Sequence, residues 1–287
     1  MTKVAILIAS HIGYEGQIDL LDNCISSLLE QIFKPKSVYI SISFENDIYK
    51  KSFISILQKY GRTTNPKINF KISKEKKHQM EHLHNICSNI CVNDYDMLMF
   101  CDDDDTYHIE RIQCFVVAFN HGKGICNTGK FGGVREHVDL DLTTSDDDLW
   151  GEIPEFWCYG IVPSAIVEFF SFFKGVNYML LQHKFGDMYF RHYLRKNSKY
   201  YEWVAIVDKD FGFTLYNYNI SNPNSICGKI QRGMGNKYDN LLTKVLDCRS
   251  EDHFNNIVKK NKKLYDIDDK LKDSLKMIYN FCKILYK

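Results

Sequence analysis

This sequence lacks both an excess of one charge and a long apolar run. The 287 residues carry 37 Lys and Arg against 36 Asp and Glu, a formal net charge of only +1. A chain so balanced has no overall field that attracts nucleic acid or an anionic membrane. No apolar stretch is long enough to cross a bilayer, and the run over residues 4–9 is too short for a signal-peptide core. We therefore expect a cytoplasmic protein with no transmembrane segment and no nucleic-acid partner.

Paired cysteines are also missing. The ten cysteines include no C-x-x-C motif, and Cys87 and Cys91 are one helical turn apart, which is a poor spacing for a zinc site. Reduced thiols in the core are the better interpretation.

What is present in the first half is an alternation of short apolar runs with helical patterns, which is typical of βαβ units and a mostly parallel sheet. Asp19 is placed to cap the first helix. The patterns predict strands at residues 4–9, 37–44, 68–72 and 95–101, and helices at residues 20–31, 48–60, 79–90 and 109–119.

The second half predicts a mixed edge and a helical tail. Residues 156–195 hold an aromatic, strand-like segment followed by two helical patterns, and residues 204–207 and 211–218 are expected to form a hairpin or a mixed edge. We expect a main domain over residues 1–232 and a helical C-terminal appendage over residues 233–287. One face of the last helix is apolar, so we expect it to pack on the main domain, with peripheral membrane contact as the alternative.

Four consecutive aspartates, Asp102, Asp103, Asp104 and Asp105, follow the strand at residues 95–101 without a spacer. In open α/β sheets ligands bind beyond the carboxyl ends of strands. Carboxylates this close raise one another's pKa unless a cation neutralises them, so a divalent metal is the economical explanation. Oxygen ligands favour Mg²⁺ or Mn²⁺, and magnesium usually shares its coordination with substrate phosphates.

A calcium loop of the EF-hand type is excluded. Counting from Asp102, the sixth and twelfth positions are Tyr107 and Gln113, where that loop needs glycine and glutamate.

The segment Phe100-Cys101-Asp102-Asp103-Asp104-Asp105, with His108-Ile109-Glu110-Arg111-Ile112 after it, resembles the D-x-D-D motif and following helix of the family 2 glycosyltransferases. Leu83-His84-Asn85-Ile86 is similar to that family's A-R-N-x-G helix. The resemblance is good over residues 1–115 and weaker up to residue 232. It implies an α/β fold of the GT-A type (nucleotide-diphospho-sugar transferase, Rossmann-like), a mixed sheet flanked by helices, here with a helical C-terminal extension.

The resemblance further implies a nucleotide-diphosphate sugar donor whose diphosphate is held by a metal on Asp104, with Asp102 contacting the ribose or the metal. Asp105 is expected to shape the site toward the acceptor. Other donor-binding positions implied in this way are Ala9, Ser10, Ser43, Glu45, His84, Asn85 and Asp103.

Two of these positions depart from the family. The aspartate that ends its second strand is Ser43 here, with Glu45 nearby as a substitute, and the arginine of its helix is His84. The loop Asn222-Pro223-Asn224-Ser225-Ile226 is similar to the family's loop after the last strand, where a polar residue can complete the metal or phosphate site.

Inverting members of the family need a carboxylate base at the start of a helix, often written as an E-D pair. The match here is Gly186-Asp187-Met188, which makes Asp187 the predicted base. A helix amino terminus tends to keep a carboxylate ionised, and a simple helix cap is the alternative. Trp157 and Tyr159 lie where the acceptor, a glycan or another hydroxyl compound, would bind, with core packing as their alternative.

Two other functions compete with an inverting glycosyltransferase. A catalytically degenerate GT-A-fold protein that binds sugar or acts as a scaffold is conceivable because the strand-two aspartate is lost. A nucleotidyltransferase would need a glycine-rich signature after the first strand, and His11-Ile12-Gly13-Tyr14 is not such a loop.

Overall fold

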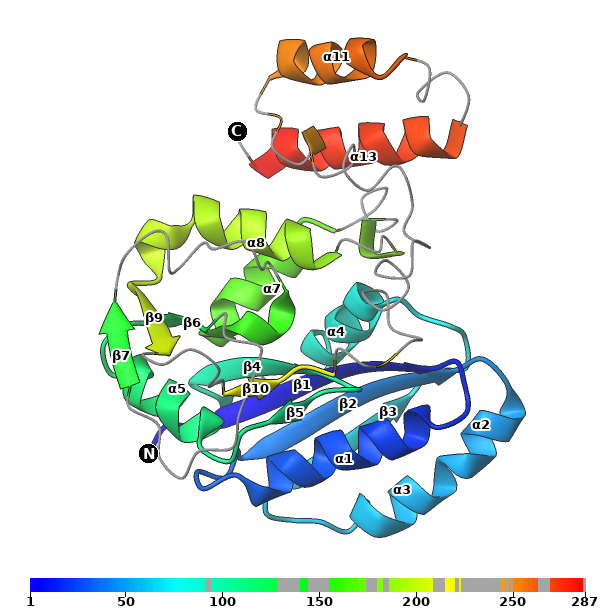
Figure 1. The fold of residues 1–287 in the computed structure, drawn as a ribbon, viewed down its shortest axis with the longest axis vertical. Helices are drawn as coiled ribbons and strands as arrows, with labels where there is room; N and C mark the ends of the chain where they lie inside the picture. The colour runs from blue at the N-terminus through cyan, green and yellow to red at the C-terminus, as the bar shows by residue number, and fades with distance from the viewer. Residues whose placement is uncertain are drawn as a thin grey trace.

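The computed structural model has a mixed eight-stranded sheet at its centre, with strand order β3-β2-β1-β4-β8-β6-β9-β7 (Figure 1). The predicted mixed sheet flanked by helices is therefore confirmed. The residues that the structure describes are 1–90, 94–127, 140–143, 155–173, 180–182, 186–208, 215–219, 222, 244–245, 248, 250–262 and 269–285.

Four parallel strands form one half of the sheet: β1 (Val4–Ile12), β2 (Ser37–Phe44), β3 (Lys67–Ile72) and β4 (Met97–Asp102). Strand β1 lies between β2 and β4, and its residues 4–8 are fully buried, as expected for an apolar run covered on both faces. All four strands run in the same direction, so their carboxyl ends meet at one edge of the sheet.

The other half of the sheet contains β6 (Gly124–Cys126), β7 (Leu140–Thr143), β8 (Tyr159–Ile161) and β9 (Trp203–Asp208). Strand β8 is antiparallel to β4 and β6, and β9 pairs in parallel with β6 and antiparallel with β7.

A separate two-stranded sheet joins distant parts of the chain. Strand β10 (Tyr216–Asn217) pairs antiparallel with β5 (Thr106–Tyr107), directly after the aspartates. Of the two arrangements expected for the late strands, the hairpin is wrong, because β9 joins the main sheet while β10 pairs with β5.

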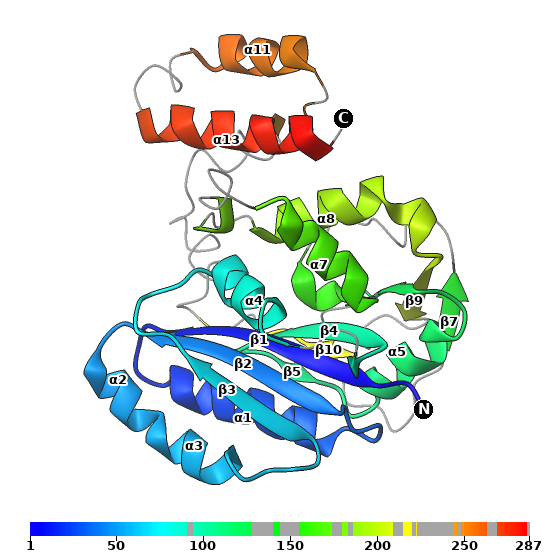
Figure 2. The same cartoon turned by 180° about the vertical axis from the view of Figure 1, so that it is seen from behind.

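Helices cover both faces of the sheet (Figures 1 and 2). One face carries α1 (Gln17–Glu30), α2 (Asp47–Ser52) and α3 (Ile54–Tyr60), and the other carries α4 (Gln79–Cys87), α7 (Pro163–Ser171) and α8 (Gly186–Lys196). Helix α5 (Arg111–Phe119) packs beside β6 and β9. The chain also forms 3-10 turns at η2 (Phe156–Cys158) and η4 (Ser198–Tyr200).

Two details of the helices differ from expectation. The helix predicted at residues 48–60 is broken at Phe53, whose buried ring packs between Phe44 and Phe70 at centroid distances of 5.4 Å each. Asp19 does not cap α1. The N-cap is Gly16, in the left-handed region at φ 87°, and Asp19 lies in the first turn.

The predicted helical extension is present as α11 (Glu251–Lys260) and α13 (Asp269–Leu285). Phe281 of α13 packs against Phe173 and Tyr189, with ring centroids 5.4 Å and 4.8 Å away. Phe254 of α11 stacks on Tyr279. The last helix thus packs on the main domain as expected, whereas the predicted boundary at 232/233 falls outside the described residues.

The cysteines and the helices of the described residues were both subjects of expectation. The eight cysteines among these residues are all buried, free thiols. None of the helices in this part of the chain is both long and apolar enough to cross a membrane.

Candidate active site

The aspartate cluster lies at the carboxyl end of β4, with Asp102 as the last residue of the strand and the other three in the turn before β5. Asp102 Oδ1 accepts a hydrogen bond from Gln79 Nε2 at 2.9 Å, and its backbone N–H donates to the hydroxyl of Tyr216 at 3.1 Å. Helix α4 and strand β10 therefore hold Asp102 from two sides.

Asp103 is held by side chains of β1 and α1. Its Oδ2 accepts hydrogen bonds from Ser10 Oγ at 2.5 Å and from Gln17 Nε2 at 3.2 Å. These contacts tie the turn to the end of β1 and the start of α1.

Asp104 and Asp105 are held by the segment after β10. Asp104 Oδ2 accepts from Asn222 Nδ2 at 2.6 Å, and Asn222 Oδ1 accepts in turn from the hydroxyl of Tyr14 at 3.1 Å. Asp105 Oδ1 accepts from the backbone N–H of Asn219 at 2.7 Å. The structure thus brings Asn222, which the sequence pointed to as a residue able to complete the site, into direct contact with the cluster.

The pKa of each of the four carboxyl groups is raised above its ordinary value. Burial, followed by the charges of neighbouring aspartates, raises the pKa of Asp102 well above its ordinary value and raises the pKa of Asp105 to about 7. The same two causes raise the pKa of Asp103 to about 7 against the opposing hydrogen bonds from Ser10 and Gln17. Burial also raises the pKa of Asp104. A cluster of this kind gains stability from a cation that replaces the protons.

The carboxylates fit a metal that is shared with a ligand. In the part of the chain that the structure describes, no three His, Cys, Asp or Glu side chains form a ready-made metal site. Mg²⁺ and similar ions are commonly bound by one or two carboxylates, with phosphates and water completing the shell. Asp102 and Asp104 suit such an ion.

Asp187 lies in the first turn of α8, where its Oδ1 accepts from the backbone N–H of Met188 at 2.8 Å. We expected the helix amino terminus to keep this carboxylate ionised, and that expectation is wrong in direction. Burial, together with the charge of Glu155, raises the pKa of Asp187 to about 7 and outweighs the hydrogen bond to the helix.

Steric contact explains why a glycine, Gly186, precedes Asp187. A Cβ placed on Gly186 would lie 2.0 Å from Sδ of Met80 and 2.1 Å from its Cγ. The Met80 side chain of α4 therefore occupies the space that the first residue of an E-D pair would need. Gly186 allows α4 and α8 to approach each other closely.

Glu155 is a site residue that the sequence did not reveal. It precedes η2, and its Oε2 accepts from Nε1 of Trp157. Its charge raises the pKa of both Asp102 and Asp187, so it lies near the metal-binding candidates and the candidate base alike. A single glutamate before an aromatic segment has no local pattern that distinguishes it from a surface residue.

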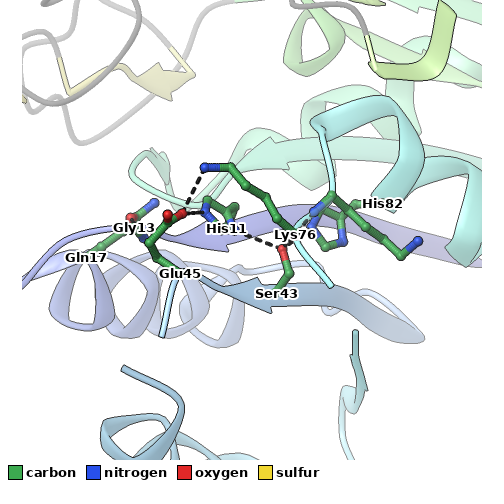
Figure 3. Close-up of polar contacts among 8 residues, drawn as sticks. His11, Gly13, Gln17, Ser43, Glu45, Lys76 and His82 are labelled. Carbon is green, nitrogen blue, oxygen red and sulfur yellow. Dashed lines mark hydrogen bonds and ion pairs between the residues drawn. The ribbon is translucent and has the colours of Figure 1, made fainter. Parts of the chain in front are cut away.

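Polar side chains also gather where β1 and β2 end (Figure 3). Ser43 is fully buried, with its Oγ 2.9 Å from His11 Nδ1 and 3.0 Å from His82 Nε2. Glu45 is half-exposed and pairs with His11 and Lys76 at 2.9 Å and 2.8 Å. A ligand at this strand end would thus meet Glu45, whereas Ser43 lies beneath the surface and its donor contact stays a prediction.

The remaining donor candidates lie in different surroundings. Ala9 is the register partner of Asp102, next to the cluster. His84 packs edge-on against Phe170 of α7 at 5.2 Å, and Asn85 Nδ2 is 3.5 Å from Ser41 Oγ. It is Gln79, at the start of the same helix, that reaches an aspartate.

The two aromatic acceptor candidates belong to the core. Trp157 is 0% exposed and stacks on Tyr216 at 4.1 Å, and Tyr159 is 1% exposed with its ring against Phe190 and Trp203. Their burial favours core packing, the alternative given for both rings, and the acceptor role stays a prediction.

Comparison with solved structures identifies the class of fold. The chain superposes on TarS 1-349 of S. aureus in complex with UDP with a TM-score of 0.53 and 11% identity, over 99% of this chain and 89% of that one. It superposes on the mannosyltransferase PcManGT from Pyrobaculum calidifontis, in complex with GDP-Man and Mn²⁺, with a TM-score of 0.51 and 9% identity, over 97% and 73% of the two chains. The protein therefore has a GT-A-like glycosyltransferase fold, as the motifs predicted.

TarS 1-349 in complex with UDP-GlcNAc gives a TM-score of 0.50 at 10% identity, over 93% of this chain and 74% of that one. No protein-family model and no curated protein matches the sequence.

Proposed function

We propose that this chain is a metal-dependent glycosyltransferase that moves a sugar from a nucleotide-diphosphate donor to a hydroxyl acceptor, with inversion at the sugar carbon. The observation that carries the proposal is the anchored cluster of four high-pKa aspartates at the carboxyl end of β4. The likeness in fold to TarS with UDP or UDP-GlcNAc, and to a mannosyltransferase with GDP-Man and Mn²⁺, supports a nucleotide-sugar donor and a divalent ion.

In this proposal Asp104 and Asp102 hold a Mg²⁺ or Mn²⁺ ion together with the donor diphosphate. Such an ion supplies electrostatic stabilisation of the departing diphosphate. Asp103 fixes the turn through Ser10 and Gln17, and Asn222 orients Asp104. Glu45 is the remaining candidate for contact with the donor at the end of β2.

Asp187 is proposed as the general base. Its Oδ1 is occupied by the Met188 N–H, so Oδ2 is the oxygen that takes the proton from the acceptor hydroxyl. A pKa of about 7 suits this task, because general bases work best when their pKa is close to the operating pH.

Binding of nucleoside diphosphates and nucleotide sugars, with and without Mn²⁺, tests the donor site by calorimetry or thermal shift. A ligand at about 100 times its Kd stabilises the folded state by about 2.7 kcal/mol, which gives a measurable shift. We expect one nucleotide family to stabilise the protein only with Mn²⁺, and Asp104→Ala to abolish the effect. Asp22→Ala is the matched control, because Asp22 pairs with Lys59 on the surface of α1.

Product analysis separates the alternatives. Metal-dependent hydrolysis of the donor, or transfer of its sugar, would support the proposed glycosyltransferase activity. Release of pyrophosphate would instead identify a nucleotidyltransferase. If no nucleotide binds in any metal condition, the protein is a sugar-binding or scaffold member of the fold.

A further inference from the structure

A line of five polar side chains runs from the surface into the core between β1, β2 and α4. Figure 3 shows four of them, Glu45, His11, Ser43 and His82. Glu45 Oε2 lies 2.9 Å from His11 Nε2, and His11 Nδ1 lies 2.9 Å from Ser43 Oγ. Ser43 Oγ lies 3.0 Å from His82 Nε2, and His82 Nδ1 lies 2.8 Å from Ser41 Oγ. Side-chain exposure falls from 50% at Glu45 to 20% at His11, and residue exposure is 1% or less at the three inner members.

The charge states at the outer end are defined. Lys76, and then His11, hold the pKa of Glu45 below its usual range, so its carboxylate is ionised and can only accept hydrogen bonds. Burial lowers the pKa of His11 and lowers that of His82 to about 3, so both imidazoles are neutral at neutral pH.

The other charged or titratable groups that face these two rings are cationic or histidine side chains. Lys76 and His78 face His11, and Lys77 and His78 face His82. Each of these groups lowers the pKa of the ring that it faces.

The number of donors and acceptors on these side chains then allows only one direction for the hydrogen bonds along the line. A neutral imidazole has one N–H and one acceptor nitrogen. Because Glu45 can only accept, His11 donates from Nε2 and its Nδ1 accepts from the Ser43 hydroxyl. Ser43 then accepts from His82 Nε2–H, and His82 Nδ1 accepts from Ser41. The backbone N–H of Lys77, 3.3 Å from Ser43 Oγ, fills the last acceptor position of that hydroxyl.

We propose that Glu45, His11, Ser43, His82 and Ser41 form one directional hydrogen-bond relay, and that protonation of His11 reverses it and moves the proton of His82 from Nε2 to Nδ1. A protonated His11 donates from both nitrogens. Ser43 must then turn its hydroxyl toward His82 Nε2, and His82 must present Nδ1–H to Ser41. The protein takes up one net proton from solvent. His11 binds it at Nδ1, while His82 releases its Nε2 proton to solvent and binds one from solvent at Nδ1, so His82 stays neutral.

The two directions of the relay differ in free energy because of its buried end, at Ser41. Ser43 is fully hydrogen-bonded in both. In the reversed direction Ser41 accepts from His82, and its other side-chain neighbour, Asn85 Nδ2 at 3.5 Å, offers a donor rather than an acceptor. The hydroxyl hydrogen of Ser41, which is 0% exposed, therefore loses its acceptor, and a buried donor without a partner is unfavourable. This bias adds to burial in keeping His11 neutral.

Reversal would place one positive charge beside Glu45, at the strand end where the donor is proposed to bind. That consequence rests on the proposed function. The relay itself belongs to the protein without ligands, so its test does not depend on sugar transfer.

Long-range ¹H–¹⁵N spectra of the full chain labelled at histidine nitrogens report the tautomer of each ring. We expect both His11 and His82 to carry their protons on Nε2 above neutral pH. As the pH falls, His82 should switch to Nδ1–H with the same midpoint as the protonation of His11, without becoming charged. In His11→Gln the His82 tautomer should be independent of pH over the same range.

A His82 tautomer that stays unchanged while His11 becomes charged would overturn the proposal, as would a switch with a different midpoint. Ser41→Ala provides a second test. Without this hydroxyl, His82 Nδ1 loses its Ser41 partner in both directions, so the difference in free energy between the two directions becomes smaller. The midpoint of His11 should rise in this variant and stay unchanged in Ser55→Ala, whose exposed hydroxyl donates to Ser52 O on the surface. An unchanged midpoint in Ser41→Ala would contradict the directional bias.

Discussion

At the scale of one residue, burial sets the pKa of Asp187, the proposed general base. Its pKa of about 7 means that it is protonated in acid and becomes a base as the pH rises through neutrality. We therefore predict transferase activity that increases with pH across about 7 and levels off above it. Initial rates over a pH series measure this, and a flat profile over that range would exclude Asp187 as the base.

Replacing this carboxylate tests the same role without changing the size of the side chain. Asp187→Asn should lower kcat by about 10²- to 10⁴-fold, the usual contribution of general acid–base catalysis. Donor binding and the thermal unfolding temperature should change little, and Asp22→Asn is the control. Full activity in Asp187→Asn would assign the proton transfer to another group, with Glu155 as the first to examine.

Gly186 and Met80 form a steric pair whose two members should be tested together. Gly186→Ala places a methyl group 2.0 Å from Met80 Sδ, so we predict a loss of about 1–3 kcal/mol in the free energy of unfolding from overpacking. In a Met80→Ala background the same change should cost less, because the space is then open. Urea denaturation of the four proteins gives the coupling energy, and additive effects would contradict the proposed contact.

Among single residues, those with a positional signal in the sequence were predicted and the others were not. Asp102, Asp103, Asp104 and Asp105 follow a buried strand directly, and this order alone marks a strand end. Gln79 and Glu155 reach the same place only because α4 and η2 pack there. The pKa direction of Asp187 also depends on burial, which no local pattern contains.

At the scale of elements, α13 is predicted to dock mainly through one ring. Phe281 contacts both Phe173 and Tyr189, so Phe281→Ala should cost about 3–5 kcal/mol locally. Hydrogen exchange should accelerate in α11 and α13 and remain unchanged in β1. Lys283→Ala, at an exposed position of the same helix, is the control, and equal exchange in both variants would argue against this anchor.

The elements themselves were predictable, and their partners less so. The parallel strands β1, β2, β3 and β4 are apolar runs near their predicted bounds. Strand β10 has the composition of a strand, but its partner β5 is a two-residue segment more than a hundred residues earlier, which no periodicity indicates. Pairing of this kind is decided by tertiary packing.

At the scale of the whole molecule, the aspartate cluster predicts how stability depends on pH. The pKa values of Asp103 and Asp105 rise from about 4 in an unfolded chain to about 7 in the fold, so the folded state binds more protons. Their stabilising contribution is present below the unfolded value and is lost as the pH rises through about 7. His82, with its lowered pKa, acts in the opposite direction as the pH falls below about 6.5.

Thermal unfolding of the metal-free protein in EDTA tests this dependence. Because His82 is common to both proteins, the comparison of the natural chain with Asp103→Asn isolates the carboxylate. We predict that Asp103→Asn is relatively more stable above neutral pH and that the difference disappears in acid. Mn²⁺ together with the donor nucleotide should restore stability to the natural chain at high pH. A difference that is independent of pH would contradict the prediction.

The contacts of Asp104 with Asn222 and of Asp105 with Asn219 span 118 and 114 residues of chain. During synthesis on the ribosome, the parallel strands β1–β4 emerge early, and amino-terminal regions generally fold first. The nascent protein can therefore build half of its sheet and display the four acidic side chains long before the segment that holds two of them has been translated. The complete set of contacts around the aspartates would then form late in synthesis, well after the nascent chain has begun to fold.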